Sequence, residues 1–382
     1  GNIDATNEGQ ITDIALPVYD KSDIKLSLAA VPTTSADKPL TLSDATNTGV
    51  ADPTTAMNTV TVSIPEVGEQ QNAPVLKIEM PSTTVVLDAN DGNKATYGQV
   101  IATTAANTLV IKEGVTVEKL IVKGGNVEIH GIVEELVRDD SNGDVVKVSS
   151  FGAADIKTVT NPGNFTFTST WDGISKKEPT AGNIYTAAQL AFYQSKQAPT
   201  DKNAKSLTPT LTEAITTLYA DIDLADKPWL GMVIEEKTFD GNGHTVKNLN
   251  MSQYILNQQQ TTYTPQACIG FFAAVYGVVT IKDITLDHVT IRPAAPSSPK
   301  WVGSLVGYSR GNVTTYENCV AKNVDIFTRG ASSYRVGGLI GYIEADGAAE
   351  NTATAVLTGC KVEGATIAVS YTHLTLPTKL EV

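Results

Sequence analysis

Aspartates that could carry out chemistry on sugars are concentrated in the middle of the chain. Asp221 and Asp223 alternate along one predicted strand, so both carboxylates would lie on the same face. Paired carboxylates can cleave a glycosidic bond, and aspartates beside a basic residue can hold a Ca²⁺ ion. The same residue type forms turns and keeps strand edges solvated, and we favour this second interpretation. The candidates are Asp221, Asp223, Asp226, Asp240, Asp283 and Asp287.

A calcium-loop motif is partly present shortly before these aspartates. Asp140, Asn142 and Asp144 reproduce its D-x-N-x-D opening. The sixth position is Val145, where the loop needs glycine, and Phe151 occupies the twelfth position, where a glutamate should bind the ion. The three residues are therefore weak calcium candidates, and we favour a polar turn.

Histidine and cysteine do not form a metal-binding pattern. The histidines are His130, His244, His288 and His373, which lack metal-ligand spacing, and the chain has no HExxH motif. The cysteines lack CxxC spacing. Cys319 and Cys360 are expected to pack as small buried hydrophobic residues. We therefore expect no metal, no cofactor and no catalytic residue.

Aromatic side chains are the stronger candidates for ligand binding, because rigid rings dock on sugars and proteins at a modest entropic cost. Tyr308 and Tyr342 occupy one repeat position, directly after Gly307 and Gly341, and could form a ladder on one face. Packing in the core or at a corner is the interpretation that we favour for each residue taken singly. The ligand-binding candidates, which would have to be exposed, are Trp229, Trp301, Tyr308, Tyr334 and Tyr342.

The composition favours strands as the elements that position these residues. Hydrophobic residues make up 41% of the 382, but only 6% are aromatic, and Val, Ile and Thr are frequent. The formal charge of −13 and the pI near 4.8 argue against nucleic acid as a partner. No apolar run approaches the roughly 18 residues of a membrane span, so the mature chain is expected to be soluble.

Residues 1–90 predict a small antiparallel β-sandwich. Short alternating segments, such as residues 59–64, are separated there by Pro, Thr, Ser and Asp. The polar stretch 33–56 would then be a loop.

Residues 91–175 predict a short β-solenoid or, alternatively, a β-meander. Residues 115–121 are echoed by residues 131–137, and Asn126 and Asn142 keep the same offset of 16. One short solenoid turn per 16 residues explains this echo, since each turn stacks its apolar face on the next.

Residues 183–369 contain Gly-rich repeats of about 35 residues. Leu249, Ile284 and Cys319 are 35 residues apart, and Cys360 follows after 41. We predict that these four side chains form one inward-facing column.

A second landmark moves in phase with the first. It begins at Ile269, Val302 and Val336, and each repeat closes on a further strand, such as Val289–Ile291 or Val324–Ile326. Strands that cannot bury their apolar side alone must stack, so we predict a right-handed parallel β-helix. The capping-box spacing of Thr186 and Gln189 predicts one short helix over residues 187–195, covering the first turn.

The repeats resemble the GLUG-type repeat proteins of bacterial surfaces, and Bacteroidetes lipoproteins are especially similar. Gly338–Gly341, its variant Ser304–Gly307 and the run from Asp221 to Leu249 carry the resemblance, which covers about residues 183–369. It implies a surface architecture without specifying an activity. Relatives include adhesin-like proteins and the flanks of IgA-cleaving metalloproteases, whose HExxH motif is missing here. Residues 75–137 also resemble, in texture alone, an N-terminal module of Bacteroidetes cell-surface proteins.

These observations predict an exported, monomeric, non-catalytic adhesion or ligand-binding module that binds a glycan or a protein at the cell surface. A polysaccharide lyase or hydrolase is the alternative. Gly1 resembles a remnant of tag cleavage after removal of an export signal, and an authentic processed N-terminus is the alternative. A lipid anchor is expected to precede it if the protein is a lipoprotein. Residues 370–382 break the repeat and are expected to be a non-native tail.

Overall fold

The chain is all-β with long parallel sheets in a computed structural model. It divides into two compact units, residues 1–170 (unit 1) and residues 171–382 (unit 2). The structure describes residues 2–5, 12–16, 23–44, 58–80, 83–102, 108–139, 144–195, 208–251, 268–292, 301–311, 313–329, 335–344 and 354–370. No helix within these ranges is long and apolar enough to cross a membrane.

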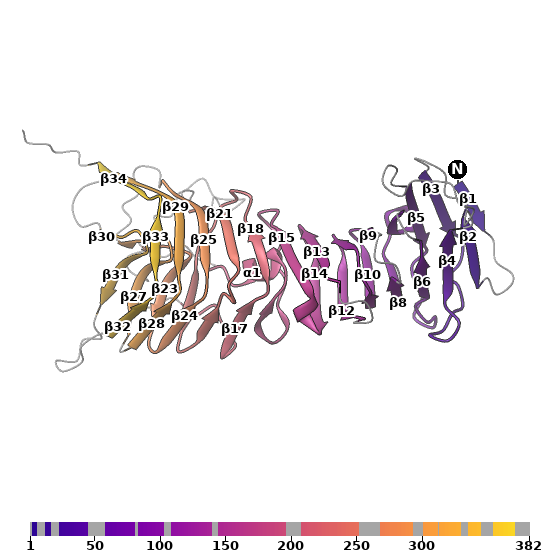
Figure 1. Cartoon of the computed structure of the whole chain (residues 1–382), viewed down its shortest axis with the longest axis horizontal. Helices are drawn as coiled ribbons and strands as arrows, with labels where there is room; N and C mark the ends of the chain where they lie inside the picture. Colours follow the sequence, from indigo (N-terminus) through magenta and orange to yellow (C-terminus); the bar gives the residue numbers. More distant parts are fainter. Residues whose placement is uncertain are drawn as a thin grey trace, which may run out of the picture. The chain divides into compact units, whose positions relative to one another are not determined.

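Unit 1 consists of two parallel sheets that the chain visits alternately (Figure 1). The first contains β1 (Asn2–Ala5), β3 (Asp23–Leu28), β5 (Asn58–Ile64), β7 (Thr83–Ala89), β9 (Thr108–Ile111), β11 (Asn126–Ile129), β13 (Val146–Phe151) and β15 (Phe165–Thr170). The second contains β2 (Asp13–Leu16), β4 (Leu40–Asp44), β6 (Val75–Glu79), β8 (Ala95–Ala102), β10 (Val115–Val122), β12 (Ile132–Arg138) and β14 (Asp155–Thr160). The intervening 3₁₀ helices are η1 (Asn90–Gly92) and η3 (Pro162–Asn164).

The antiparallel sandwich predicted for residues 1–90 is wrong. Val60 of β5 pairs in parallel with Ile24 on one side and Val85 on the other. Alternation in a sequence reports that one strand face is buried, but it does not report the direction of the neighbouring strand. The predicted loop over 33–56 is also wrong in part, because it contains β4.

The 16-residue echo is confirmed between β10 and β12. Val117 lies opposite Val133 and Leu120 opposite Leu136, and all four side chains are buried. The pairing is parallel, which a meander would not give. The asparagine echo is not matched in register, since Asn126 lies opposite Lys147, and Asn142 is outside the described residues.

The described residues of unit 2 form four parallel sheets. Sheet I consists of β22 (Cys268–Ile269), β26 (Trp301–Val302) and β30 (Arg335–Val336), and sheet II of β19 (Met232–Glu235), β23 (Phe272–Tyr276), β27 (Val306–Arg310) and β31 (Ile340–Glu344). Sheet III consists of β16 (Asn183–Ile184), β17 (Ile215–Leu218), β20 (Thr238–Asp240), β24 (Val279–Lys282), β28 (Val313–Glu317) and β32 (Thr354–Thr358). Within unit 2, sheet IV consists of β18 (Ala220–Asp223), β21 (Thr245–Asn250), β25 (Thr285–Ile291), β29 (Val320–Arg329), β33 (Lys361–Glu363) and β34 (Thr366–Ser370).

From β22 onward the chain visits sheets I, II, III and IV in that order, and one such pass is called a cycle. The second landmark is confirmed as the start of each cycle, because Ile269 pairs with Val302, and Val302 with Val336. The closing strands are confirmed too, with Ile326 between Ile291 and Ile367. Figure 1 shows β25, β29 and β33 side by side in this order.

The predicted four-residue column is wrong at its first member. Leu249 pairs with Val289, 40 residues later, instead of lying in line with Ile284. The spacing from β21 to β25 is longer than the spacing from β25 to β29, and the similar letters at 246–249 and 281–284 concealed this difference. Ile284, Cys319 and Cys360 do follow one another, since Val320 N donates to Ile284 O at 2.9 Å and Lys361 N to Cys319 O at 3.0 Å.

The predicted helix is observed as α1 (Ala187–Phe192), after the 3₁₀ helix η4 (Thr180–Gly182). Its capping box is confirmed, with Gln189 N donating to Thr186 Oγ1 at 3.2 Å and Thr186 N to Gln189 Oε1 at 3.1 Å. Leu190 and Tyr193 are buried, whereas Phe192 is 37% exposed. Ser195 N donates to Gly231 O at 2.8 Å, which ties the end of the helix to the start of sheet II.

Candidate functional site

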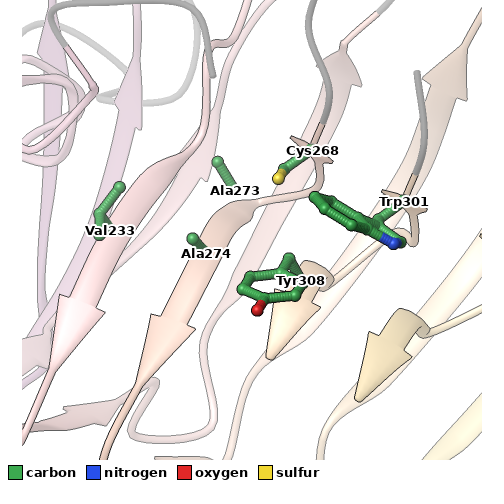
Figure 2. Packing of buried hydrophobic residues seen from close by; sticks show 6 residues of the cluster. All are labelled: Val233, Cys268, Ala273, Ala274, Trp301 and Tyr308. Atoms are coloured by element: carbon green, nitrogen blue, oxygen red, sulfur yellow. The ribbon is translucent and has the colours of Figure 1, made fainter. Parts of the chain in front are cut away.

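Three aromatic rings from two consecutive cycles gather at the junction of sheets I and II. We name them, Trp301, Tyr308 and Tyr342, the aromatic cluster. Tyr308 lies opposite Tyr342 in register. The Trp301 ring centroid is 4.7 Å from that of Tyr308 and 5.9 Å from that of Tyr342, with which it stacks at 10°. The predicted ladder of Tyr308 and Tyr342 therefore exists. Figure 2 shows Trp301 and Tyr308 side by side, beside Cys268.

Glycines make this junction possible. A Cβ on Gly307 would lie 2.7 Å from the backbone nitrogen of Ile269, and one on Gly341 would lie 2.5 Å from that of Val302. Real Cβ atoms do not approach backbone so closely, so the two sheets can meet here only without side chains. A glycine recurs at this position in successive cycles because each cycle repeats this close approach of the two sheets.

The core packing that we favour for each aromatic candidate taken singly is confirmed for three of them. Trp301 and Tyr308 are 8% and 0% exposed, and Trp229 is 1% exposed. Trp229 lies apart from the cluster in the core, where it stacks on Phe271 at 5.5 Å and donates from Nε1 to the Phe271 carbonyl at 3.2 Å. Large aromatic rings bury the most apolar area, so packing them in the core gives the largest hydrophobic stabilisation. Tyr342 is half-buried, and Tyr334 lies outside the described residues.

Charged groups surround the outer part of the cluster. The Arg335 guanidinium carbon lies 3.9 Å from the centroid of the Tyr342 ring, which is a cation–π geometry. The Tyr308 hydroxyl donates to the Glu344 carboxylate. Burial raises the pKa of Tyr308, and the hydrogen bond and charge of Glu344 raise it further, so this tyrosine stays protonated.

Two buried polar atoms beside the cluster have no hydrogen-bond partner within the part of the chain that the structure describes. They are Trp301 Nε1 and the Tyr276 hydroxyl. The Tyr276 ring lies 6.1 Å from that of Tyr308. Burial is the main cause that raises the pKa of Tyr276, so its hydroxyl also remains a donor. An unpaired buried donor costs free energy, which an acceptor atom of a bound molecule or water would recover.

The aspartate candidates are distributed among turns and strands, where each of the following has a partner. Asp221 lies 3.2 Å from His244 Nδ1, and the Asp240 carboxylate lies 2.6 Å from Lys282 Nζ. Asp287 accepts from the Asn323 amide at 2.8 Å, and it lies inside sheet IV instead of at an edge. These contacts give the aspartates structural partners. Asp226 itself adopts a left-handed backbone, φ 57°.

The lowered pKa of Asp223 argues against a role as a general acid. Burial by itself would raise its pKa, but hydrogen bonds from Asn248, the Ala225 backbone and Lys247 outweigh burial and hold the pKa below its usual value. A carboxylic acid that donates a proton near neutral pH needs a raised pKa. Asp223 is therefore an ionised acceptor in a turn.

The sequence analysis did not identify two asparagines with a left-handed backbone, Asn318 at a corner and Asn323 inside β29. Asn318 and Asn323 have φ of 50°, and each donates its amide at 2.8 Å to an aspartate one cycle earlier, Asp283 and Asp287. Asparagine tolerates this backbone better than other residues that carry a Cβ. The recurrence of Asp and then Asn after 35 and 36 residues was the available signal.

The calcium candidates give no ion site in the described residues, because Asp140 and Asn142 lie outside them. The backbone oxygen of Asp144 accepts from Arg138 Nη2 at 2.5 Å. Across the described ranges, no group of three or more His, Cys, Asp or Glu residues could hold a metal ion.

Comparison with known proteins found no matching family model, no similar curated protein and no similar solved structure.

Proposed function

We propose that this chain is a non-catalytic ligand-binding module, with its binding site at the outer edge of the aromatic cluster. The observation that carries the proposal is the position of Arg335 over the half-buried ring of Tyr342, backed by Trp301 and Tyr308. Packed rings fix Tyr342 in place, so a ligand would meet a preorganised surface at little entropic cost.

A glycan that carries a carboxylate fits this surface best, and a protein surface is the second possibility. Sugar rings dock on aromatic faces, and Arg335 offers a planar donor to a carboxylate.

The finer architecture that we propose for unit 2 is a right-handed parallel β-helix. Each of its sheets is parallel, and the chain returns to them in a constant order. Connections between parallel strands of one sheet are right-handed in about 98% of cases. A regular scaffold of this kind presents equivalent positions of successive cycles along one flank.

The setting that we propose is the surface of a bacterium, as the resemblance to GLUG-type repeat proteins implies. The ion pairs and amide contacts of the aspartates support binding without catalysis, since they leave Asp223 and Asp240 engaged in structural bonds. A polysaccharide-processing enzyme is the competing possibility that the experiment must separate.

The test is a glycan and protein array with the intact chain, followed by titration of the best ligand. Tyr342→Ala should weaken binding by 10-fold or more, on the order of a lost aromatic anchor. Tyr219→Ala is the matched control, because it removes a half-buried tyrosine that stacks on Tyr185 instead of joining the cluster. Equal affinity of the wild type and Tyr342→Ala would refute the site, and release of cleaved product from any glycan would refute the non-catalytic role.

A further inference from the structure

Large apolar side chains become exposed at the last described cycle. Leu357, Val362 and Ile367, which we name the end face, are 49%, 40% and 44% exposed. Their register partners one cycle earlier, Tyr316, Ala321 and Ile326, are all 0% exposed. The same positions are therefore core within the stack and surface at its end.

The backbone at this end is open as well. Among the described strands, β32, β33 and β34 each pair with a neighbour on one side only. Unpaired strand edges beside exposed apolar side chains are the usual template for pairing with another chain. The end face thus has both the apolar area and the hydrogen-bonding groups of an interface.

Strand β33 has a charge pattern that is complementary to itself. Val362 points inward, since its methyl carbons lie 3.1 and 3.3 Å from the position of a Cβ on Gly338. Lys361 and Glu363 flank it and are exposed. In an antiparallel pair of β33 strands centred on Val362, Lys361 of each copy would face Glu363 of the other, and the two valines would meet.

We propose that the end face binds a second copy of this chain, in a two-fold dimer whose axis passes through Val362. The interface is isologous, so the same patch serves both copies and the assembly closes at two. Leu357 and Ile367 are then covered, and the core of each copy continues into the other. This inference is independent of the proposed ligand site, and it replaces the monomer expected from the sequence.

The experiment is sedimentation and light scattering of the intact chain over a concentration range of about 1–100 µM. The expected mass is twice the 40.4 kDa of one chain. Lys361→Glu and Glu363→Lys each place like charges opposite one another, so each should raise the dissociation constant of the dimer by roughly 10-fold or more. The double variant Lys361→Glu with Glu363→Lys restores both pairs and should restore the dimer.

The control is Lys147→Glu, an equal charge change on an exposed side chain of β13 in unit 1, which should leave the dimer intact. Circular dichroism checks that every variant is folded. A monomer at all concentrations overturns the proposal, including the case in which residues 371–382 cover the end face. A wild-type dimer that neither single variant weakens, or an open series of larger species, overturns it equally.

Discussion

The side-chain amide of Asn318 donates a 2.8 Å hydrogen bond to the carboxylate of Asp283, and both residues hold a left-handed backbone, with φ of 50° and 52°. Gly359 continues the series one cycle later with φ of 66°. The corner between sheets III and IV therefore requires a left-handed backbone in three consecutive cycles. The residue at this corner varies only among Asp, Asn and Gly, which tolerate that conformation.

Asn318→Ala should lower the free energy of unfolding by about 1–2 kcal/mol, because alanine is strained in the left-handed region and cannot donate to Asp283. Asn318→Gly loses the hydrogen bond but keeps the backbone, so it should cost less than the alanine variant. Urea unfolding of both variants measures the difference. If alanine is tolerated as well as glycine, the corner does not impose its backbone.

Gly307→Ala should destabilise unit 2 by about 1–3 kcal/mol, because the new Cβ would meet the backbone nitrogen of Ile269 at 2.7 Å. The near-UV signal of Trp301 should change as the junction moves. Gly163→Ala is the control, since nothing lies within 4 Å of the added carbon and φ is not positive. Similar melting curves for the two variants would contradict the close approach.

Asp223→Asn should make the free energy of unfolding less dependent on pH in the acidic range. The pKa of Asp223 is lower in the folded chain than in the unfolded chain, so its contribution is present above the unfolded pKa and is lost as pH falls through the folded pKa. The wild type should therefore lose more stability than the variant between pH 6 and pH 2. Chemical unfolding at several pH values measures this, and parallel losses would show that the aspartate contributes nothing.

Leu190→Asp should destabilise α1 and the strands nearest to it by a few kcal/mol, because it buries an unpaired charge at a position that is fully buried. Hydrogen exchange should rise first in β16 and β17, before β28 and β32. Phe192→Asp is the control on the same helix, because Phe192 is 37% exposed and an aspartate there should remain hydrated. A uniform loss of protection in Leu190→Asp would argue against a capping role.

Local patterns predicted the strands, the capping box and the repeat starts, because each depends on residues close in sequence. Thr186 and Gln189 lie within one helical turn, and the glycines near Val302 and Val336 recur with nearly constant spacing. Strand direction in residues 1–90 could not be predicted, because Val60 alternates in the same way whether its neighbours run parallel or antiparallel.

The site was predicted only in part. Tyr308 and Tyr342 could be matched because both follow the repeated glycine, and a ladder follows from stacking alone. Core packing is the interpretation favoured for each ring taken singly, and Trp229 confirms it. The sequence could not show which ring stays accessible, since that depends on what neighbouring sheets contribute. The Asp–Asn corners were visible as a spacing, but their φ values were not.

The constant register across cycles of unequal length has a consequence for how this chain can change. Cys319 follows Ile284 by 35 residues and Cys360 follows Cys319 by 41, while the pairing on both sides of β29 remains parallel and in register. The additional residues fall between Glu344 and Thr354, where β31 ends and β32 begins. Insertions and deletions can therefore change the length of such a connection without moving any strand. New binding segments can be acquired in this way, one cycle at a time. A foreign peptide inserted between Glu344 and Thr354 should likewise be displayed without unfolding the chain.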